Sequence, residues 1–257
     1  MRNLSDFVEI AVQQNSLPQY LYKYRAINDN TKKIIENNQL WFSKPADFND
    51  PFDCKIIPET NNTLADVITY LEENTTNVPK HEITTLAQSF IKNPVELDRI
   101  VKTAVDNVIS KSGVCCFSEI NDNILMWSHY SEDHKGICLK FDVLQDSQFF
   151  IYPLRVDYLD TYPRINYIKQ NKEFVNVLIR SKSNDWIYEK EIRVYKRESK
   201  LYDFKKEALV EVIFGCKAES DEIDKFKDLV NQNGYNNVVF KKAKLKDFEY
   251  GLDFEII

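Results

Sequence analysis

Two glutamates stand two positions apart in the segment WIYEKEIRVYK, residues 186–196. Successive side chains of a strand point to opposite faces, so Glu189, Glu191 and Arg193 are expected on one face. Two carboxylates at this spacing repel each other, which a purely structural strand has no need to tolerate. The pair therefore indicates a site that works through carboxylates. The alternative is a solvated strand face on which Arg193 forms a salt bridge.

Other polar residues lie where expected strands end. Arg25 closes the aromatic, alternating segment YLYKYR, and Ser118 follows Phe117 in GVCCFSE. Each also fits an ordinary structural role: Arg25 in a surface ion pair, Phe117 in the core and Ser118 as a helix cap. A shared site requires Arg25, Ser118 and Glu191 to converge on one cleft, although they are far apart in the sequence.

The elements that must position these residues mix strands and helices without a regular strand–helix–strand rhythm, which predicts an α+β fold. Aromatic and β-branched alternation marks the strands, and Asn28 or Asp29 caps a short helix that buries Ile34 and Ile35. Strands are expected at residues 20–25, 39–43, 113–119, 135–143, 150–158, 187–196, 208–215, 238–245 and 253–257.

Residues 60–111 differ from the rest of the chain because they show no strand-like alternation. They predict two or three helices, the clearest of which has Asn93 as its cap and Pro94 at its first position. We expect a single domain over residues 1–257, with 60–111 as a helical insertion that packs beside the sheet and supplies no catalytic group.

Composition and motifs argue against several classes of protein. The formal net charge is −6, from 34 Lys and Arg against 40 Asp and Glu, which argues against sequence-independent clamping of nucleic acid. Neither a GxGxxG fingerprint nor a Walker A loop occurs, so a Rossmann domain and a P-loop NTPase are not indicated. His129 and His134 have no companion Cys or His pattern, so we expect no metal site.

The cysteines and the first residues bear on the compartment. Five cysteines without a CxxC pair predict free thiols in a reducing environment. The segment MRNLSDFVEIAVQQ carries Asp6 and Glu9 within its apolar stretch, which predicts an amphipathic helix and not a signal peptide. No apolar run approaches the ~18 residues that span a bilayer. We therefore expect a soluble, cytoplasmic protein.

Four segments carry a resemblance to a known family: LYKYR, LWFSKPADFNDPFD, CCFSEINDNILMWSHYSEDHKGICLKFD and WIYEKEIRV. They cover about half of the chain and resemble a bacterial domain-of-unknown-function family, numbered 2971. In the same order they are similar to the arginine–serine–glutamate branch of the ADP-ribosyltransferase superfamily. That branch has an arginine ending a first strand, an aromatic–serine motif on a later strand and Glu-x-Glu on a late strand. The chain departs from it at Ser118–Glu119, where the branch has Ser-Thr.

The resemblance implies a split β-sheet with flanking helices, and NAD as the substrate. It implies that Glu191 stabilises the oxocarbenium character that develops on the ribose when nicotinamide leaves. Glu189 would orient or deprotonate the acceptor. The implied NAD-binding residues are Arg25, for the pyrophosphate or ribose, and Tyr24, Phe117, Ser118 and Asn49.

By this resemblance the protein is an NAD-dependent ADP-ribosyltransferase or NAD glycohydrolase, in the setting of a bacterial toxin or phage-defence effector. Its expected partners are NAD, a protein or nucleic-acid acceptor, and an antitoxin or other regulatory protein; no membrane is expected.

Two other classes stay open from the residues themselves. One is a non-catalytic module that binds a partner through aromatic residues. The other is a metal-dependent nuclease that gathers four carboxylates around Mg²⁺, those of Asp50, Asp53, Glu189 and Glu191. Asn49, Asp50 and Asp53 equally fit a turn, because Asn and Asp side chains bond their own backbone.

Overall fold

The computed structural model describes residues 4–257, and over this range the chain divides into two compact units. Unit 1 consists of the described residues up to Ser43 together with Gly113–Val156 and Asp185–Ile257. Unit 2 consists of Lys44–Ser112 and Asp157–Asn184. Unit 2 is therefore larger than the predicted insertion. It also takes in residues 157–184, because β3 (Ile57–Pro58) pairs in parallel with β8 (Arg164–Ile165).

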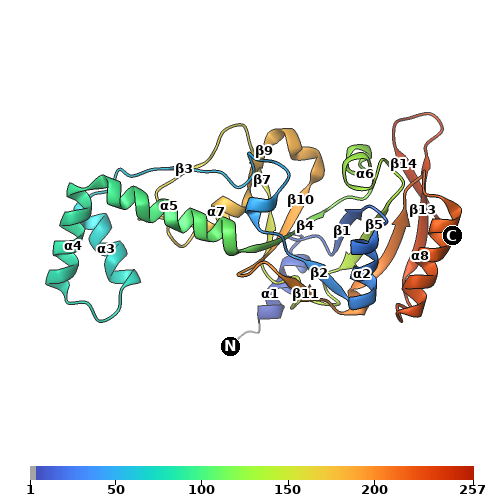
Figure 1. Cartoon of the computed structure of the whole chain (residues 1–257), viewed down its shortest axis with the longest axis horizontal. Coiled ribbons are helices and arrows are strands. Elements are labelled where there is room, and N and C mark those ends of the chain that lie inside the picture. Colours follow the sequence, from blue (N-terminus) through green and yellow to red (C-terminus); the bar gives the residue numbers. More distant parts are fainter. Residues whose placement is uncertain (1–3) are drawn as a thin grey trace. The chain divides into compact units, whose positions relative to one another are not determined.

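A mixed sheet of eight strands, counted over the described residues, forms the centre of unit 1 (Figure 1). Its order is β14-β13-β12-β5-β1-β4-β10-β6, and only the β12–β13 pair among these neighbours is parallel. Together with the separate helices, this sheet gives an α+β protein. The strands are β1 Tyr20–Arg25, β4 Gly113–Ser118, β5 Ile137–Asp142, β6 Pro153–Arg155, β10 Glu191–Lys196, β12 Leu209–Phe214, β13 Val239–Leu245 and β14 Leu252–Ile256.

The register of the sheet divides its side chains between two faces. Residues directly opposite on neighbouring strands share a face, so one face carries a row of polar side chains across five strands. We call this set the polar row and this side of the sheet the polar face. The polar row consists of Glu191, Ser118, Tyr22, Lys140 and Glu211.

The opposite side, the core face, carries the alternate positions and is apolar. It includes Leu21, Cys115, Phe117, Leu139, Phe141, Ile192, Val194 and Val212, all in one buried cluster. Helices α1 (Leu4–Gln13), α2 (Asp29–Asn37) and α8 (Ser220–Gln232) contribute to the same cluster. The predicted helix after β1 is confirmed as α2, with the Asn28 side chain accepting from the Thr31 N–H. Each fully buried apolar side chain contributes roughly 1.5–3 kcal/mol, so this face stabilises the unit.

On the polar face lies the short helix α6 (Ile124–Tyr130). Its Met126 and Trp127 pack on Tyr24, Cys138 and Ile213. The Asn123 side chain begins this helix by accepting from the Leu125 and Met126 N–H groups. Helix α6 thus covers the part of the polar face beside the polar row.

The sheet is weakly joined between β1 and β4. Strands β1 and β5 pair along their whole length, from Tyr20–Asp142 to Arg25–Ile137, whereas β1 and β4 share the single pair Tyr22–Ser118. The Lys23 Nζ donates to the Cys116 carbonyl at 2.9 Å, a side-chain bond beside this single pair. The polar row crosses the sheet at the one place where its two halves pair.

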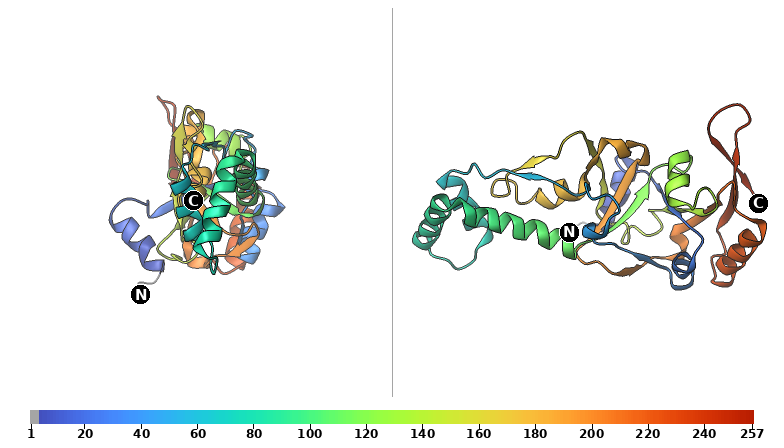
Figure 2. Two further views of the ribbon diagram at one scale, coloured as in Figure 1. Left: turned by 90° about the vertical axis from the view of Figure 1, so that its left-hand side faces the viewer. Right: turned by 45° about the horizontal axis from the view of Figure 1, so that its top comes forward.

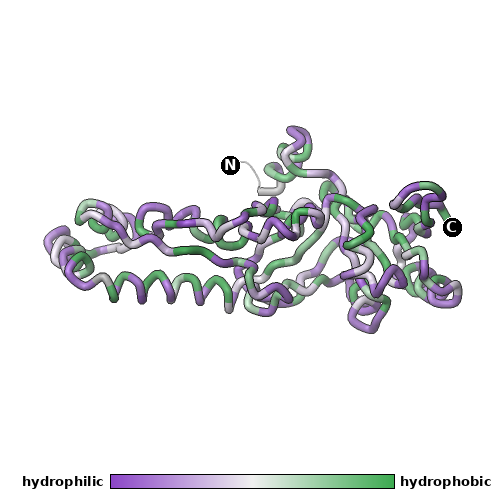
Figure 3. The backbone as a smooth tube through the Cα atoms, turned by 90° about the horizontal axis from the view of Figure 1, so that it is seen from above, coloured by the Kyte–Doolittle hydropathy of each residue, from purple (hydrophilic) through white to green (hydrophobic). Residues whose placement is uncertain are grey.

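Unit 2 contains the helices predicted for residues 60–111. They are α3 (Leu64–Asn74), α4 (Lys80–Lys92) and α5 (Pro94–Lys111), drawn in teal to green in Figures 1 and 2. Their core is a separate cluster of Val67, Leu71, Ile83, Ala87, Leu97 and Ile168. Hydrophilic and hydrophobic residues recur around the helical turns of this unit in Figure 3, as helices with one buried side require. Asn93 precedes α5 as predicted, but its side chain makes no capping hydrogen bond.

Short elements complete both units, with bounds as follows: β2 Gln39–Trp41, η1 Pro45–Asp47, β7 Asp157–Leu159, α7 Phe174–Arg180, β9 Ser181–Ser183, η2 Asn184–Glu189, β11 Leu201–Asp203 and η3 Lys206–Ala208. Among the helices of the described residues, none combines the length and the apolar character that crossing a bilayer requires.

Candidate active site

The two glutamates that define the candidate site belong to different elements. Glu189 ends the 3₁₀ helix η2, and strand β10 begins only at Glu191. Between them Lys190 has a φ of 46°, a left-handed conformation that interrupts the extended backbone. The predicted strand at 187–196 therefore starts too early. Glu189 lies outside β10, so it does not share a strand face with Glu191 as predicted.

Both glutamate side chains are nevertheless buried. Glu189 is 3% exposed and Glu191 is 4% exposed. The alternative of a solvated strand face is therefore wrong. A carboxylate in this setting loses its hydration and has to be stabilised by partners within the protein.

One partner of Glu191 is Arg193, two positions along the same strand face. The Arg193 Nε lies 2.9 Å from Glu191 Oε1, and Nη2 lies 3.0 Å from Oε2. The guanidinium is 0% exposed, so the pair is buried on both sides. Two parallel charge-assisted bonds fix the carboxylate in one orientation.

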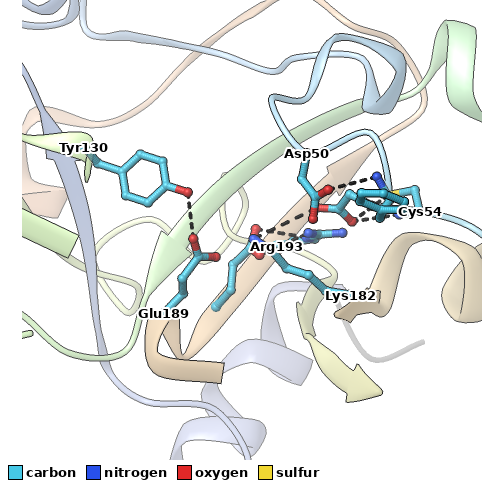
Figure 4. Close-up of polar contacts among 9 residues, drawn as sticks. Asp50, Cys54, Tyr130, Lys182, Glu189 and Arg193 are labelled. Carbon is cyan, nitrogen blue, oxygen red and sulfur yellow. Dashed lines mark hydrogen bonds and ion pairs between the residues drawn. The ribbon is translucent and has the colours of Figure 1, made fainter. Parts of the chain in front are cut away.

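Glu189 is held through both its side chain and its backbone. The Tyr130 hydroxyl, at the end of α6, donates to Glu189 Oε1 at 2.7 Å (Figure 4). The Ser118 hydroxyl donates to the Glu189 carbonyl oxygen at 2.6 Å and accepts from the Ile120 N–H at 3.2 Å. Ser118 therefore connects the end of β4 to the segment that carries both glutamates.

Aromatic rings gather beside Tyr130. The ring centroid of His129 lies 6.4 Å from that of Trp186 and 6.2 Å from that of Tyr188. The Trp186 and Tyr188 centroids are 6.0 Å apart. Rings from α6 and η2 thus offer flat surfaces near Glu189 on which a heterocycle can stack.

Arg25 is not part of this arrangement. It lies opposite Ile137 on the core face, an odd number of positions from Tyr22, which pairs with Ser118. Its Nε donates to Thr31 Oγ1 at 3.3 Å, and burial lowers the pKa of the guanidinium. The predicted convergence of Arg25, Ser118 and Glu191 is therefore met only by Ser118 and Glu191.

Phe117 is also on the core face, where it fills the structural role. Its ring packs edge-on against Phe141 and Phe150, with centroids 5.8 and 5.6 Å away. It faces away from Glu191 and cannot support a nicotinamide ring on the polar face. Tyr24, by contrast, lies on the polar face.

Tyr24 is buried and serves to hold α6 against the sheet. Its hydroxyl donates to the Ile120 carbonyl at 2.9 Å, and its ring meets Trp127 edge-on at 5.3 Å. Burial raises the pKa of Tyr24 far above its ordinary value. The hydroxyl therefore remains a neutral donor at any physiological pH.

Asn49, Asp50 and Asp53 belong to unit 2. Asn49 is exposed in the loop after η1. Asp50 Oδ1 accepts from the Phe52 N–H at 2.8 Å and Asp53 Oδ1 from the Cys54 N–H at 2.7 Å, which confirms both aspartates as turn formers. Over the described residues, no three His, Cys, Asp or Glu side chains form a group that could hold a metal ion.

Sequence reasoning missed Tyr130 and the buried setting of Arg193. Tyr130 follows His129 in the same helix, and nothing in the spacing distinguishes the two. The signal for Arg193 was present, since a charge between Ile192 and Val194 in a strand must either face water or find a partner.

Comparison with known proteins bears on part of the chain. The model of a family described as Protein of unknown function (DUF2971) matches residues 126–194, a range that contains Tyr130, Glu189, Glu191 and Arg193. No curated protein and no solved structure matches the chain.

Proposed function

We propose that unit 1 is an NAD-dependent ADP-ribosyltransferase or NAD glycohydrolase that works through Glu191 and Glu189. The observation that carries this proposal is the pair of buried carboxylates fixed by Arg193 and Tyr130. Burying two carboxylates a few residues apart is costly, and such sites are concentrated where chemistry needs them.

The chemistry proposed is cleavage of the bond between nicotinamide and ribose C1′. Nicotinamide leaves with the electron pair of that bond, and positive charge develops on the ribose. Glu191, held in one orientation by Arg193, stabilises this charge as a preorganised carboxylate. In transfer, Glu189 accepts the proton of the acceptor hydroxyl and C1′ bonds to that oxygen; in hydrolysis, C1′ bonds to a water oxygen whose proton passes to solvent.

The sheet geometry supports this proposal in part. The single pair between β1 and β4 divides the sheet beside Ser118, which is the kind of split that the resemblance implies. The arginine of the arginine–serine–glutamate layout lies on the core face, so the proposal rests on the carboxylates and not on the whole layout. The rings of His129, Trp186 and Tyr188 take the stacking role that the resemblance gave to Phe117.

The test is release of nicotinamide from NAD⁺, measured in EDTA so that a metal-dependent activity is removed. Glu191→Gln keeps the side-chain volume but removes the charge, and turnover should fall on the order of 10²-fold or more. Glu189→Gln should spare hydrolysis while impairing the labelling of acceptors in a bacterial extract supplied with labelled NAD⁺. Glu255→Gln, at a partly exposed glutamate on β14 that pairs with Lys244, is the matched control.

Two results would contradict the proposal. One is a wild-type protein that releases no nicotinamide under any of these conditions. The other is equal activity in wild type and Glu191→Gln, which would leave the Glu191–Arg193 pair as a structural feature alone.

A further inference from the structure

The far end of the polar row holds a buried charge that its surroundings do not fully satisfy. Glu211 on β12 is 5% exposed. Its Oε2 lies 2.7 Å from Lys241 Nζ and 3.9 Å from Lys140 Nζ. Its Oε1 is buried and has no hydrogen-bond partner.

An unpartnered carboxylate oxygen at this depth needs an explanation. It has lost its hydration, and no protein donor replaces the lost hydrogen bonds. Native proteins leave few such atoms, and each calls for an explanation such as a catalytic role or a bound group. The oxygen therefore marks a position for a donor group that comes from outside the chain.

The neighbours of Glu211 indicate which kind of ligand could supply this donor group. The Lys140 ammonium lies 4.2 Å from the ring centroid of Tyr20 and 6.0 Å from that of Tyr22. Tyr20 is 39% exposed, so the aromatic edge of this site reaches solvent, whereas Glu211 itself is buried. Burial, followed by the charge of Glu211, raises the pKa of Tyr22 to about 12. The site thus offers one acceptor, two cationic donors and two aromatic rings.

We propose that this end of the polar row binds the adenine base of the dinucleotide, a step that rests on the function proposed above. Adenine presents an amino donor beside a ring-nitrogen acceptor on one edge. The amino group donates to Glu211 Oε1, and the ring nitrogen accepts from Lys140 or Lys241. Tyr20 and Tyr22 supply the apolar surface for the base.

The length of the row fits one dinucleotide. Glu191 and Glu211 are separated by four strand intervals, through Ser118, Tyr22 and Lys140. At roughly 4.8 Å an interval, the row is about 19 Å long. Nicotinamide at Glu191 and adenine at Glu211 therefore require the dinucleotide to lie extended along the row.

The test compares adenosine monophosphate with inosine monophosphate as probes in a calorimetric titration. Inosine carries a carbonyl oxygen where adenosine has the amino group, so it would place an acceptor against Glu211 Oε1. Wild type should bind adenosine monophosphate about 10- to 100-fold more tightly, the effect of one hydrogen bond to a buried charge. Glu211→Gln should abolish or reverse this preference, because its amide can donate to the inosine carbonyl.

Controls separate this subsite from the proposed function. Glu255→Gln should keep the preference for adenosine monophosphate, and Tyr20→Ala should weaken the binding of both probes.

Equal binding of the two probes by wild type, no binding of either, or a preference that survives in Glu211→Gln overturns the subsite. If Glu211→Gln fails to fold, the ratio of the wild-type affinities for the two probes alone decides. Nicotinamide release without discrimination between the probes leaves the function standing and rejects the subsite. Discrimination between the probes without nicotinamide release supports the subsite and rejects the proposed function.

Discussion

The two faces of the unit 1 sheet are built on opposite principles. On the core face, Phe117 and Ile192 join one continuous apolar cluster in which burial itself is favourable. On the polar face, Glu191, Arg193 and Glu211 are buried as charges, and burial is favourable only where partners replace water. The core face therefore accounts for the fold. The polar face carries features that the fold does not require, which is where function is to be sought.

The largest effect expected from this difference follows from breaking the buried pair. Arg193→Met leaves Glu191 buried without its guanidinium, so the free energy of unfolding should fall by about 3–5 kcal/mol. Adding Glu191→Leu removes the orphaned charge and should recover most of that loss. Denaturation by urea, followed by circular dichroism, measures both.

Arg197→Met, at an exposed position just beyond the strand, is the matched control and should change stability by no more than about 0.5 kcal/mol. A single variant as stable as wild type, or a double variant no better than the single, would show that the pair is not a stability-coupled unit.

A smaller effect is expected on substituting Phe117 and Ser118, which are adjacent in sequence and lie on opposite faces. The two substitutions should differ in their effect on turnover. Phe117→Leu leaves a partly filled space and should lower the free energy of unfolding by about 1–3 kcal/mol. Turnover per folded molecule should stay unchanged. Ser118→Ala removes the donor to the Glu189 carbonyl, a comparable loss of about 1–3 kcal/mol, and should also reduce turnover roughly tenfold.

Stability and nicotinamide release are measured on the same preparations of both variants. Turnover that falls equally in both would remove the functional distinction between the faces. Rescue of turnover by Ser118→Thr, which restores the hydroxyl, would support the role assigned to that group.

The elements of this fold were largely accessible from the sequence because they depend on local patterns. Alternation predicted β1 with its observed bounds, and Asn28 capped the helix expected after it. Spacing likewise indicated the helices of residues 60–111. Each of these signals is contained within a dozen neighbouring residues.

The site was less accessible, because it depends on long-range register. Whether Arg25 shares a face with Glu191 is decided by the pairs Tyr22–Ser118 and Ser118–Glu191, and no local pattern contains them. A register different by one residue moves every side chain to the other face. The positive φ of Lys190 was equally hidden, since lysine carries no preference for that conformation.

The smallest effect concerns the alkaline stability contributed by Tyr22 in the polar row. Its pKa is raised from 10.0 to about 12, first by burial and then by Glu211. Between pH 10 and about 12 the unfolded chain loses the Tyr22 proton while the folded protein keeps it. Ionisation then favours the unfolded state, so the contribution is complete below pH 10 and is lost as the pH rises through the folded pKa.

Tyr22→Phe removes this titration, so the stability of wild type should fall more steeply with pH than that of the variant over the same range. The difference should be less than the full shift implies, because the side chain is only half-buried and solvent screens the charge.

Other buried tyrosines titrate equally in both proteins, and their contributions cancel in the difference. Tyr250→Phe, at a fully exposed residue between β13 and β14, should follow wild type. Glu211→Gln removes the second cause of the shift and should bring the wild-type slope closer to that of Tyr22→Phe. Identical slopes in wild type and Tyr22→Phe would mean that the row is hydrated at this point, and the contrast between the two faces would then be confined to the Glu191 end.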